Sequence, residues 1–409
     1  MPRSIELREP GGETLEEKTL KTYHCDLWRG GFEGVLSSGA QTFCLFIAIR
    51  FFNAGETIKA LIAAAPFMGM FLSMLLLHYA SLTNWKKSTW GAVPSFITGC
   101  CLLIAAWAQS LTLFACLVIA GYICRSALLP FITEIYSDNY PPGKRATFFS
   151  KPLLLSVGIA ALSGFIGSWF LELNINNYHW IFTFLGLCAF AKAVAIFSMP
   201  SEPIVNSPHT NPFGNMKYII EDKSFGYVLL TWFIMGFANL WTLPLRVDYV
   251  TAPEWGIEGS AIYVAMIITI IPETIRMILI PFWASLFDKM NFVVLRMILN
   301  LFFGFGVLLF FVTSNPWVIG MGSALIGAAF AGGSIAWNLW VTKYAPPGKA
   351  GAYMSVHVSL TGIRGTIGPI LGYWTVNLIG ARNIGIVSFV MMFFATLMLI
   401  PEIKHGAKR

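Results

Sequence analysis

Long apolar runs recur along this chain, and each is close to the roughly 20 residues that a helix needs to cross a lipid bilayer. Hydrophobic residues make up 56% of the 409 residues and charged residues only 11%, whereas a soluble domain carries about 25% charged residues. The sequence therefore predicts an all-α integral membrane protein. Its twelve expected transmembrane helices are Phe32–Phe52, Ile58–Tyr79, Ser88–Trp107, Thr112–Ser137, Thr147–Leu171, Tyr178–Met199, Phe225–Tyr249, Ala261–Phe287, Phe292–Thr313, Pro316–Tyr344, Ala350–Ile379 and Ile384–Ile400.

Lys and Arg residues concentrate in every second connector, and this pattern predicts the orientation of the chain. If the N-terminus is inside, only Arg50, Lys59, Arg246 and Arg382 fall on the outer side. Because cytosolic connectors carry the excess of Lys and Arg, both termini are expected in the cytosol and the protein in the cell membrane. The net charge of +7 is distributed over these connectors, with no basic patch interleaved with aromatics, which argues against a nucleic-acid partner.

The longest connector, residues 200–223, is rich in Pro, Asn and Ser, as expected of a cytosolic linker. It separates two predicted six-helix bundles, residues 28–199 and 224–401. Residues 1–27 are polar and lack the apolar core of a signal peptide. We therefore expect a cytosolic tail at each end, residues 1–27 and residues 402–409.

The two predicted bundles share short sequence strings at corresponding places. Asn139-Tyr-Pro-Pro-Gly-Lys144 follows the fourth apolar run, and Tyr344-Ala-Pro-Pro-Gly-Lys349 follows the tenth. Ala80-Ser-Leu82 closes the second run and Ala284-Ser-Leu286 closes the eighth, at nearly the same offset along the chain. The second half is therefore expected to repeat the first, as in transporters whose six-helix halves are related about the membrane normal.

These features resemble the major facilitator superfamily, whose signature Gly-x-x-x-Asp-Arg lies between the second and third helices. The first copy here, Ala80-Ser-Leu-Thr-Asn84-Trp-Lys86-Lys87, has Asn84 in place of the usual Asp, whereas the second, Ala284-Ser-Leu-Phe-Asp288-Lys289, keeps the acid and the base. The resemblance implies alternating access around a central cavity, with no cofactor or metal. It also implies inner-loop gating contacts that help hold the outward-facing state, made by Asn84, Lys86, Lys87, Asp288 and Lys289.

Ionisable residues at membrane depth are costly and mark functional sites by default. Arg125, Arg276 and Arg364 lie near the expected midplane with a single carboxylate, Glu273. Glu273 and Arg276 share a helix face three residues apart, which leaves Arg125 and Arg364 without an obvious fixed partner. A bound organic anion would supply one, because a guanidinium holds a carboxylate or phosphate through two parallel hydrogen bonds. Alternatively, Glu33, Glu134 or backbone carbonyls satisfy these arginines permanently.

Proton coupling needs a group that changes charge during the transport cycle, and Glu273, Glu33, Glu134 and His357 are the candidates. Lys192 is expected to extend its ammonium to the membrane interface.

Further substrate contacts are expected from aromatic and amide side chains. Stacking rings and amide donors in the apolar runs suit an organic solute, and the candidates are Trp337, Asn338, Gln41 and Asn239.

Together these features predict a secondary or facilitative transporter for a small organic solute, with an anion preferred and protons as the candidate coupling ion. One chain supplies both halves, so a monomer suffices. The alternatives are a multidrug or metabolite exporter and a membrane-embedded non-transport protein, such as a lipid-modifying enzyme or a sensor. An enzyme is disfavoured because no two Asp residues are close enough in sequence to suggest a metal cluster.

Overall fold

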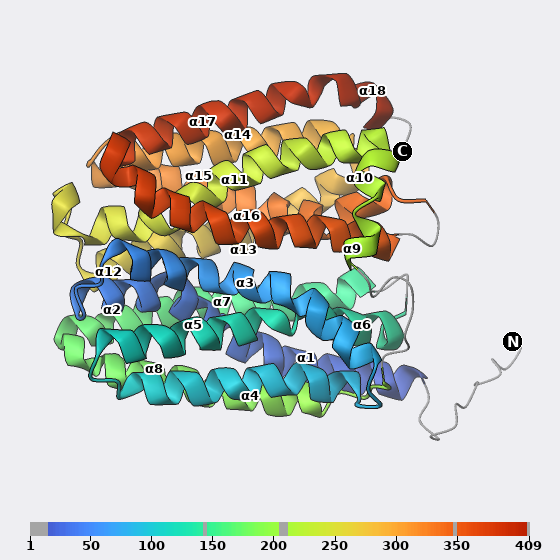
Figure 1. The fold of residues 1–409 in the computed structure, drawn as a ribbon, viewed down its shortest axis with the longest axis horizontal. Coiled ribbons are helices and arrows are strands. Elements are labelled where there is room, and N and C mark those ends of the chain that lie inside the picture. The colour runs from blue at the N-terminus through green and yellow to red at the C-terminus, as the bar shows by residue number, and fades with distance from the viewer. Residues whose placement is uncertain (1–14, 142–144, 204–211, 347–349, 407–409) are drawn as a thin grey trace, which may run out of the picture.

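The computed structural model describes residues 15–141, 145–203, 212–346 and 350–406. Within these residues, eleven helical segments are long and apolar enough to cross a membrane. The helix α16 (Ala350–Ile379) is a twelfth segment of comparable length, whose run of small and polar residues makes it less apolar. The predicted all-α fold of two six-helix bundles is confirmed, and the first and last described helices begin and end on the same side of the molecule (Figure 1).

The first bundle contains six membrane-crossing segments. A short π-helical turn interrupts the first, the fourth is divided at Leu128, and a short 3-10 turn precedes the sixth. Their bounds are α1 (Leu15–Ser38) with η1 (Gly39–Phe43) and α2 (Cys44–Arg50), α3 (Glu56–Ser81), α4 (Lys87–Ala106), α5 (Leu111–Ala127) with α6 (Leu129–Asn139), α7 (Arg145–Leu173), and η3 (Ile175–Asn177) with α8 (Tyr178–Phe197).

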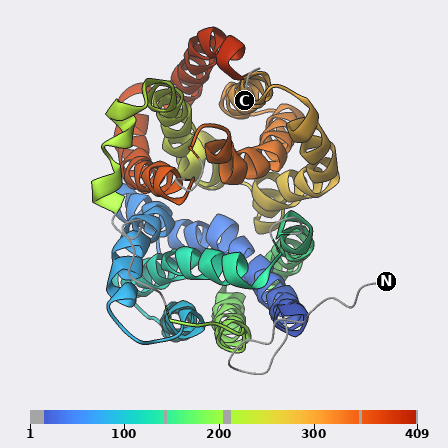
Figure 2. The same ribbon diagram turned by 90° about the vertical axis from the view of Figure 1, so that its right-hand side faces the viewer.

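The second bundle repeats this plan after two short helices, α9 (Pro212–Asn215) and α10 (Tyr218–Glu221). Its elements are α11 (Lys223–Thr251), η5 (Pro253–Trp255), α12 (Ala261–Ala265) with η6 (Met266–Ile270) and α13 (Ile271–Lys289), α14 (Phe292–Phe311), α15 (Pro316–Leu339) with η7 (Trp340–Lys343), α16, α17 (Ala381–Met398), η8 (Ile400–Glu402) and α18 (Ile403–Gly406). Figure 2, viewed from the end that holds the termini, shows the two bundles as separate groups of helices.

The described part of α1 runs from Leu15, well before the apolar run, and polar residues in these early turns are bound by the rest of the first bundle. The Thr19 hydroxyl donates to the Asn139 carbonyl at 2.6 Å. The buried Asp26 carboxylate accepts hydrogen bonds from Arg29 at 2.5 Å and from Tyr136 at 2.5 Å. Burial and this neighbouring carboxylate raise the pKa of the Tyr140 hydroxyl above its ordinary value.

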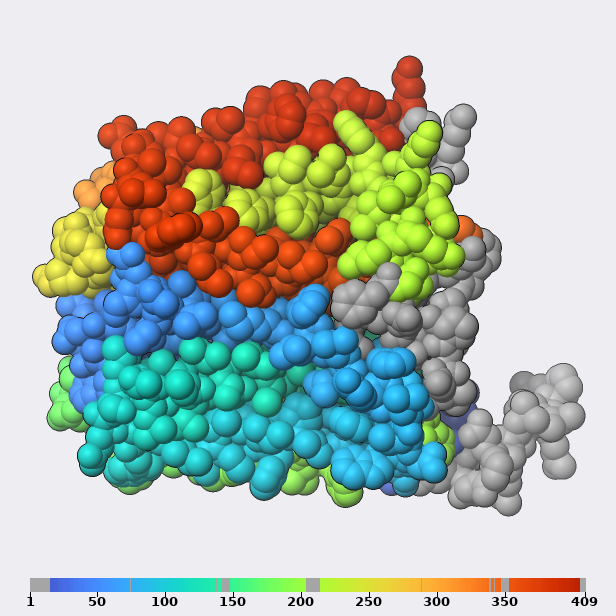
Figure 3. Space-filling model, in the orientation of Figure 1, coloured from blue at the N-terminus to red at the C-terminus, as the bar shows by residue number. Residues whose placement is uncertain are grey.

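The two bundles meet along two long contacts, α3 with α16 and α7 with α13. Figure 3 shows α16 lying against α3 along the face in view. At the end opposite the termini, the Lys59 ammonium of α3 lies 2.6 Å from the Asp248 carboxylate of α11, and both side chains are buried. Arg50 donates to the Gly259 carbonyl at 3.2 Å nearby. Among the described residues, every ion pair between the bundles lies at this end.

Two π-helical turns, η1 and η6, face each other across the junction of the bundles. The hydroxyls of Thr42 and Thr269, one from each turn, are 2.5 Å apart and buried. A π-turn inserts one residue into a helix and is frequent at functional sites. Here the two turns direct Gln41 of the first bundle toward Glu273, which lies just after η6.

Close packing of α3 on α5 depends on a residue without a side chain at Gly69. A Cβ built there would lie 2.2 Å from the backbone oxygen of Ile123, so α5 would have to shift. We expect Gly69→Ala to lower the free energy of unfolding by about 2 kcal/mol, since overpacking of this kind costs about 1–3 kcal/mol. Thermal unfolding in detergent measures the change.

The matched control is Gly320→Ala, where the nearest atoms to an added Cβ are 3.9 Å away or more. This substitution should be neutral or slightly stabilising, because alanine is the better helix former. Equal effects of the two substitutions would contradict the proposed close packing at Gly69.

Candidate substrate cavity

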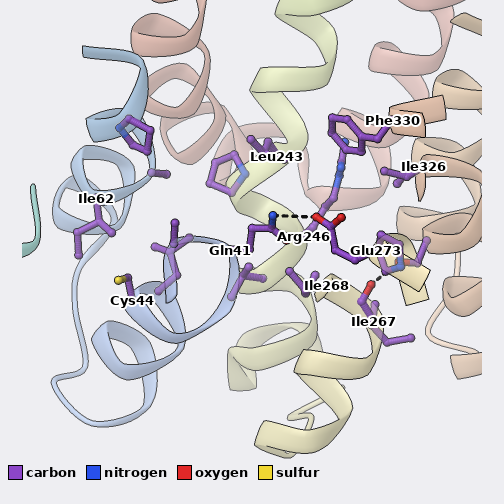
Figure 4. A pocket seen from close by; sticks show the side chains of 18 of the residues that line it. Gln41, Cys44, Ile62, Leu243, Arg246, Ile267, Ile268, Glu273, Ile326 and Phe330 are labelled. Atoms are coloured by element: carbon purple, nitrogen blue, oxygen red, sulfur yellow. Dashed lines mark hydrogen bonds between the residues drawn. The ribbon is translucent and has the colours of Figure 1, made fainter. Parts of the chain in front are cut away.

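A cavity of about 290 Å³ lies between the two bundles, near the π-turns. The segments η1, α2, α3 and α5 line it from the first bundle, and η6, α11, α13, α14 and α15 line it from the second. Most of its wall is apolar and aromatic. The charged and amide side chains in that wall are Gln41, Arg125, Arg246, Glu273 and Arg276, three of which are labelled in Figure 4.

Glu273 lies at the centre of the polar wall and is bound from both bundles. Gln41 donates to its Oε1 at 3.1 Å across the junction, as the dashed line in Figure 4 shows. Arg276 donates to its Oε2 at 3.2 Å from one turn further along α13, and to the Ser334 hydroxyl at 2.9 Å. The pairing expected from the spacing of Glu273 and Arg276 is therefore present, with a partner from the first bundle added.

Arg125 reaches the cavity from α5 and has a fixed carboxylate partner, Glu33 of α1. Lys192 of α8 lies 2.5 Å from the other Glu33 oxygen and is 2% exposed. The expectation that Lys192 extends to the interface was wrong, because the Glu33 carboxylate lies within reach in the interior of the bundle. For Arg125, the structure shows the alternative in which a carboxylate of the protein is its partner.

Arg246 was missed as a cavity residue, because its place near the end of an apolar run suggested the outer connector. The helix α11 instead continues to Thr251 and buries Arg246 to 5% exposure. Its guanidinium donates to Asn239 at 2.7 Å and to Thr242 at 3.4 Å, both neutral oxygens. Within the described part of the chain it has no acidic partner. The spacing of seven residues from Asn239, two helical turns, is the sequence feature that could have revealed it.

Several predicted substrate and coupling residues lie elsewhere. Arg364, Trp337 and His357 are absent from the described lining and belong to a cluster inside the second bundle. Asn239 lies behind the cavity wall, as the acceptor that orients Arg246. The side chain of Asn338 is outside the described residues.

The predicted inner-loop residues lie near the ends of α3, α4 and α13. Asn84, Lys86 and Lys289 are exposed, and the side chain of Asp288 is outside the described residues. Lys87 is buried and lies 2.6 Å from Asp138 and 3.4 Å from Glu134 of α6, within the first bundle. Glu134 is thus paired near the helix end and is not part of the described cavity lining.

The charges around the cavity do not balance. Arg125, Arg246 and Arg276 face it with one lining carboxylate, Glu273, and Lys192 and Glu33 stand behind Arg125. Arginine keeps its proton in proteins, so the group is cationic. Two bundles thus enclose a cationic cavity near the middle of the membrane-crossing helices. This arrangement defines a secondary transporter fold.

Comparison with known proteins agrees with this class. The family model described as Major Facilitator Superfamily matches residues 34–365 and again residues 253–409. The chain belongs to this family, as its sequence features suggested, and is a multi-pass membrane transporter rather than an enzyme. No curated protein sequence gives a significant match.

Solved transporter structures share the fold at low sequence identity. The nucleoside transporter NupG has a TM-score of 0.69 at 12% identity, covering 96% of this chain and 99% of that one. A POT family transporter in complex with 5-aminolevulinic acid has 0.72 at 14%, covering 94% and 96%. A D-xylose-proton symporter has 0.68 at 16%, covering 93% and 96%. At these identities the similarity establishes the fold alone.

The Glu33 carboxylate holds two cations inside the first bundle, and its removal tests that arrangement. We expect Glu33→Gln to lower the free energy of unfolding by about 3 kcal/mol, because it leaves Arg125 and Lys192 without a counter-charge. Denaturation in detergent measures this loss. Adding Lys192→Met should recover part of it.

The matched control is Glu134→Gln, because the Glu134 side chain is 44% exposed and Lys87 keeps Asp138. Partly exposed ion pairs contribute about 1 kcal/mol or less. A loss for Glu33→Gln no greater than for this control would show that the buried triad is not a stabilising element.

Proposed function

We propose that the protein carries a small organic solute with an anionic group, bound in the central cavity by Arg246. Arg246 is the observation that supports this most directly, since its buried guanidinium has only neutral partners among the described residues. A buried charge without a counter-charge is costly, and a carboxylate or phosphate would remove that cost. Arg276 and Arg125, each already paired, would add to the positive potential.

The apolar wall of the cavity suits the organic part of such a solute. Ile62 and Phe67 of α3 line it from the first bundle, and Phe330 of α15 and Phe310 of α14 from the second. Ligand sites are commonly of this kind, mostly apolar with a few polar groups that fix orientation. The volume of about 290 Å³ favours a small metabolite over a peptide-sized solute.

Glu273 is the proposed coupling residue, because its carboxylate is held from both bundles at once. With Glu273 ionised, Gln41 and Arg276 both donate to it. Protonation would remove the negative charge that binds Arg276 and weaken the link to Gln41. The halves could then separate, and Arg276 would become available to the solute. The proposed proton coupling therefore acts on the same contact that joins the bundles.

The orientation proposed from the connectors places both termini in the cytosol and the protein in the cell membrane. In that orientation the Lys59–Asp248 contact closes the outer end. A monomer is the proposed functional unit, since residues from both halves of one chain line the cavity.

The first test is the effect of a panel of carboxylates, phosphates, neutral sugars, nucleosides and organic cations on thermal stability in detergent. A ligand at about 100 times its dissociation constant should add about 2.7 kcal/mol. We expect an organic anion to stabilise the protein and Arg246→Gln to remove that stabilisation. Lys86→Gln, an exposed cation outside the cavity, is the control. Stabilisation by neutral or cationic solutes only would contradict the proposal.

The role of Glu273 is tested by separating coupled transport from exchange in proteoliposomes. Glu273→Gln keeps a hydrogen-bonding side chain but cannot gain or lose a proton. We expect it to abolish uptake driven by a pH gradient while retaining exchange of labelled for unlabelled solute. Uptake that still responds to the pH gradient would assign coupling to another residue, and loss of both activities would make Glu273 a binding residue.

A further inference from the structure

A second group of unbalanced cations lies inside the second bundle, away from the cavity. It is centred on Trp232 of α11, and we call it the Trp232 cluster. Its members come from four membrane-crossing segments and none lines the described cavity. They are Trp232, Arg296 of α14, Trp340 of η7, and His357 and Arg364 of α16.

The two arginines of the cluster contact two parts of the same tryptophan residue, its backbone carbonyl and its indole ring. Arg364 donates to the backbone carbonyl of Trp232, and the guanidinium carbon of Arg296 lies 3.7 Å from the centre of its ring. Arg364 is 5% exposed and Arg296 is 3% exposed. Their other hydrogen bonds are to neutral atoms, the Thr361 hydroxyl at 3.0 Å and the Met235 sulfur at 3.0 Å.

Within the described part of the chain, no carboxylate forms an ion pair with these two arginines. In the described ranges neither arginine has an acidic partner, and the nearby titratable group, His357, is another cation when protonated. Two like charges in a medium of low dielectric constant repel each other more strongly than in water. A cation–π contact with Trp232 offsets only part of the cost of burying the Arg296 charge. The cluster therefore carries a net positive charge that none of its described neighbours neutralises.

The cluster also has more hydrogen-bond donors than acceptors. The Nε atoms of Arg296 and Arg364 and the indole nitrogens of Trp232 and Trp340 are buried without a partner. Guanidinium and indole nitrogens only donate, so only an acceptor can satisfy them. Both ring nitrogens of His357 are buried without a partner as well. The centre of this ring lies 5.0 Å from the centre of the Trp232 ring and 5.3 Å from that of the Trp340 ring.

Packing around the cluster limits the size of an acceptor. The Trp232 and Trp340 rings are stacked with their centres 5.3 Å apart. A Cβ added to Gly236 would lie 2.4 Å from the guanidinium carbon of Arg364, so the Arg364 side chain already fills the space beside Gly236. Such surroundings suit a single compact ion better than an organic molecule.

We propose that the Trp232 cluster binds one small inorganic anion of the size of chloride. The anion would accept hydrogen bonds from the two guanidinium groups and neutralise one of their charges. Because the cluster joins α11, α14, η7 and α16, anion binding would stabilise the second bundle. The site is separate from the substrate cavity and does not depend on the identity of the solute.

The experiment compares thermal unfolding in sodium chloride with that in sodium gluconate at equal ionic strength, using the purified full-length chain. We expect a saturable, chloride-specific rise in the unfolding temperature. Arg296→Gln should raise the half-saturating chloride concentration about tenfold or more, as loss of a charged hydrogen-bond donor predicts. Arg382→Gln, which replaces an exposed arginine outside the cluster, should leave that concentration unchanged.

A second measurement does not depend on a variant that folds. Crystals of the unmodified protein grown in sodium bromide should show an anomalous peak within hydrogen-bonding distance of the Arg296 and Arg364 guanidinium groups. A water molecule at that position, bromide confined to the cavity or the surface, or a chloride effect that Arg296→Gln leaves unchanged would each overturn the proposal.

Discussion

The absence of bulk water inside the bilayer governs where this protein places its charges. A buried ion there must find its partner within the protein or in a ligand, because desolvation of an unpaired charge exceeds most other single contributions to stability. In the first bundle, Arg125 and Lys192 each have a carboxylate partner, because both donate to Glu33. Among the described residues, Arg246, Arg296 and Arg364 have no such charged partner. Those positions are where ligands are expected.

The contacts between the bundles are polar near the middle of the helices and ionic at the end opposite the termini. Gln41 with Glu273 and Thr42 with Thr269 join the halves beside the cavity. Lys59 and Asp248 join the bundles at the end opposite the termini, and Trp255 donates to the same aspartate at 3.0 Å. Since a secondary transporter exposes its site to each side in turn, these contacts belong to the conformation closed at that end. A solute that displaces Gln41 from Glu273 would therefore shift the equilibrium between this conformation and the one that is open at that end.

Hydropathy, the internal repeat and the loop signature were sufficient to predict the fold and the family. They depend on bilayer thickness and on local sequence, which one chain reveals without tertiary information. The pairing of Glu273 with Arg276 was also predictable, because helical spacing brings residues three apart onto one face. Glu33 was one of the partners considered for Arg125, but the sequence could not decide between it and Glu134, and its contact with Lys192 was not predicted. Glu33 lies on a different helix, and the rotation of α1 depends on its packing. The π-turn at η1, which directs Gln41 toward Glu273, has no dependable sequence signature.

Arg246 lines the cavity although the sequence suggested the outer side, and Arg364 lies within the second bundle although the sequence suggested the cavity. Both differences have the same cause. A residue's distance from the end of an apolar run predicts its depth in the membrane, but it does not predict which neighbours its side chain meets. Arg364 lies mid-helix, yet its guanidinium occupies the space beside Gly236 within the second bundle. Arg246 lies near a helix end, yet Asn239 and Thr242 hold it in the cavity wall. The absence of a side chain at Gly236 leaves room for Arg364 within the second bundle, whereas the Asn239 amide holds Arg246 in the cavity wall. The cationic excess predicted for a single site is therefore divided between two, one that borders the cavity and one enclosed by tryptophan rings.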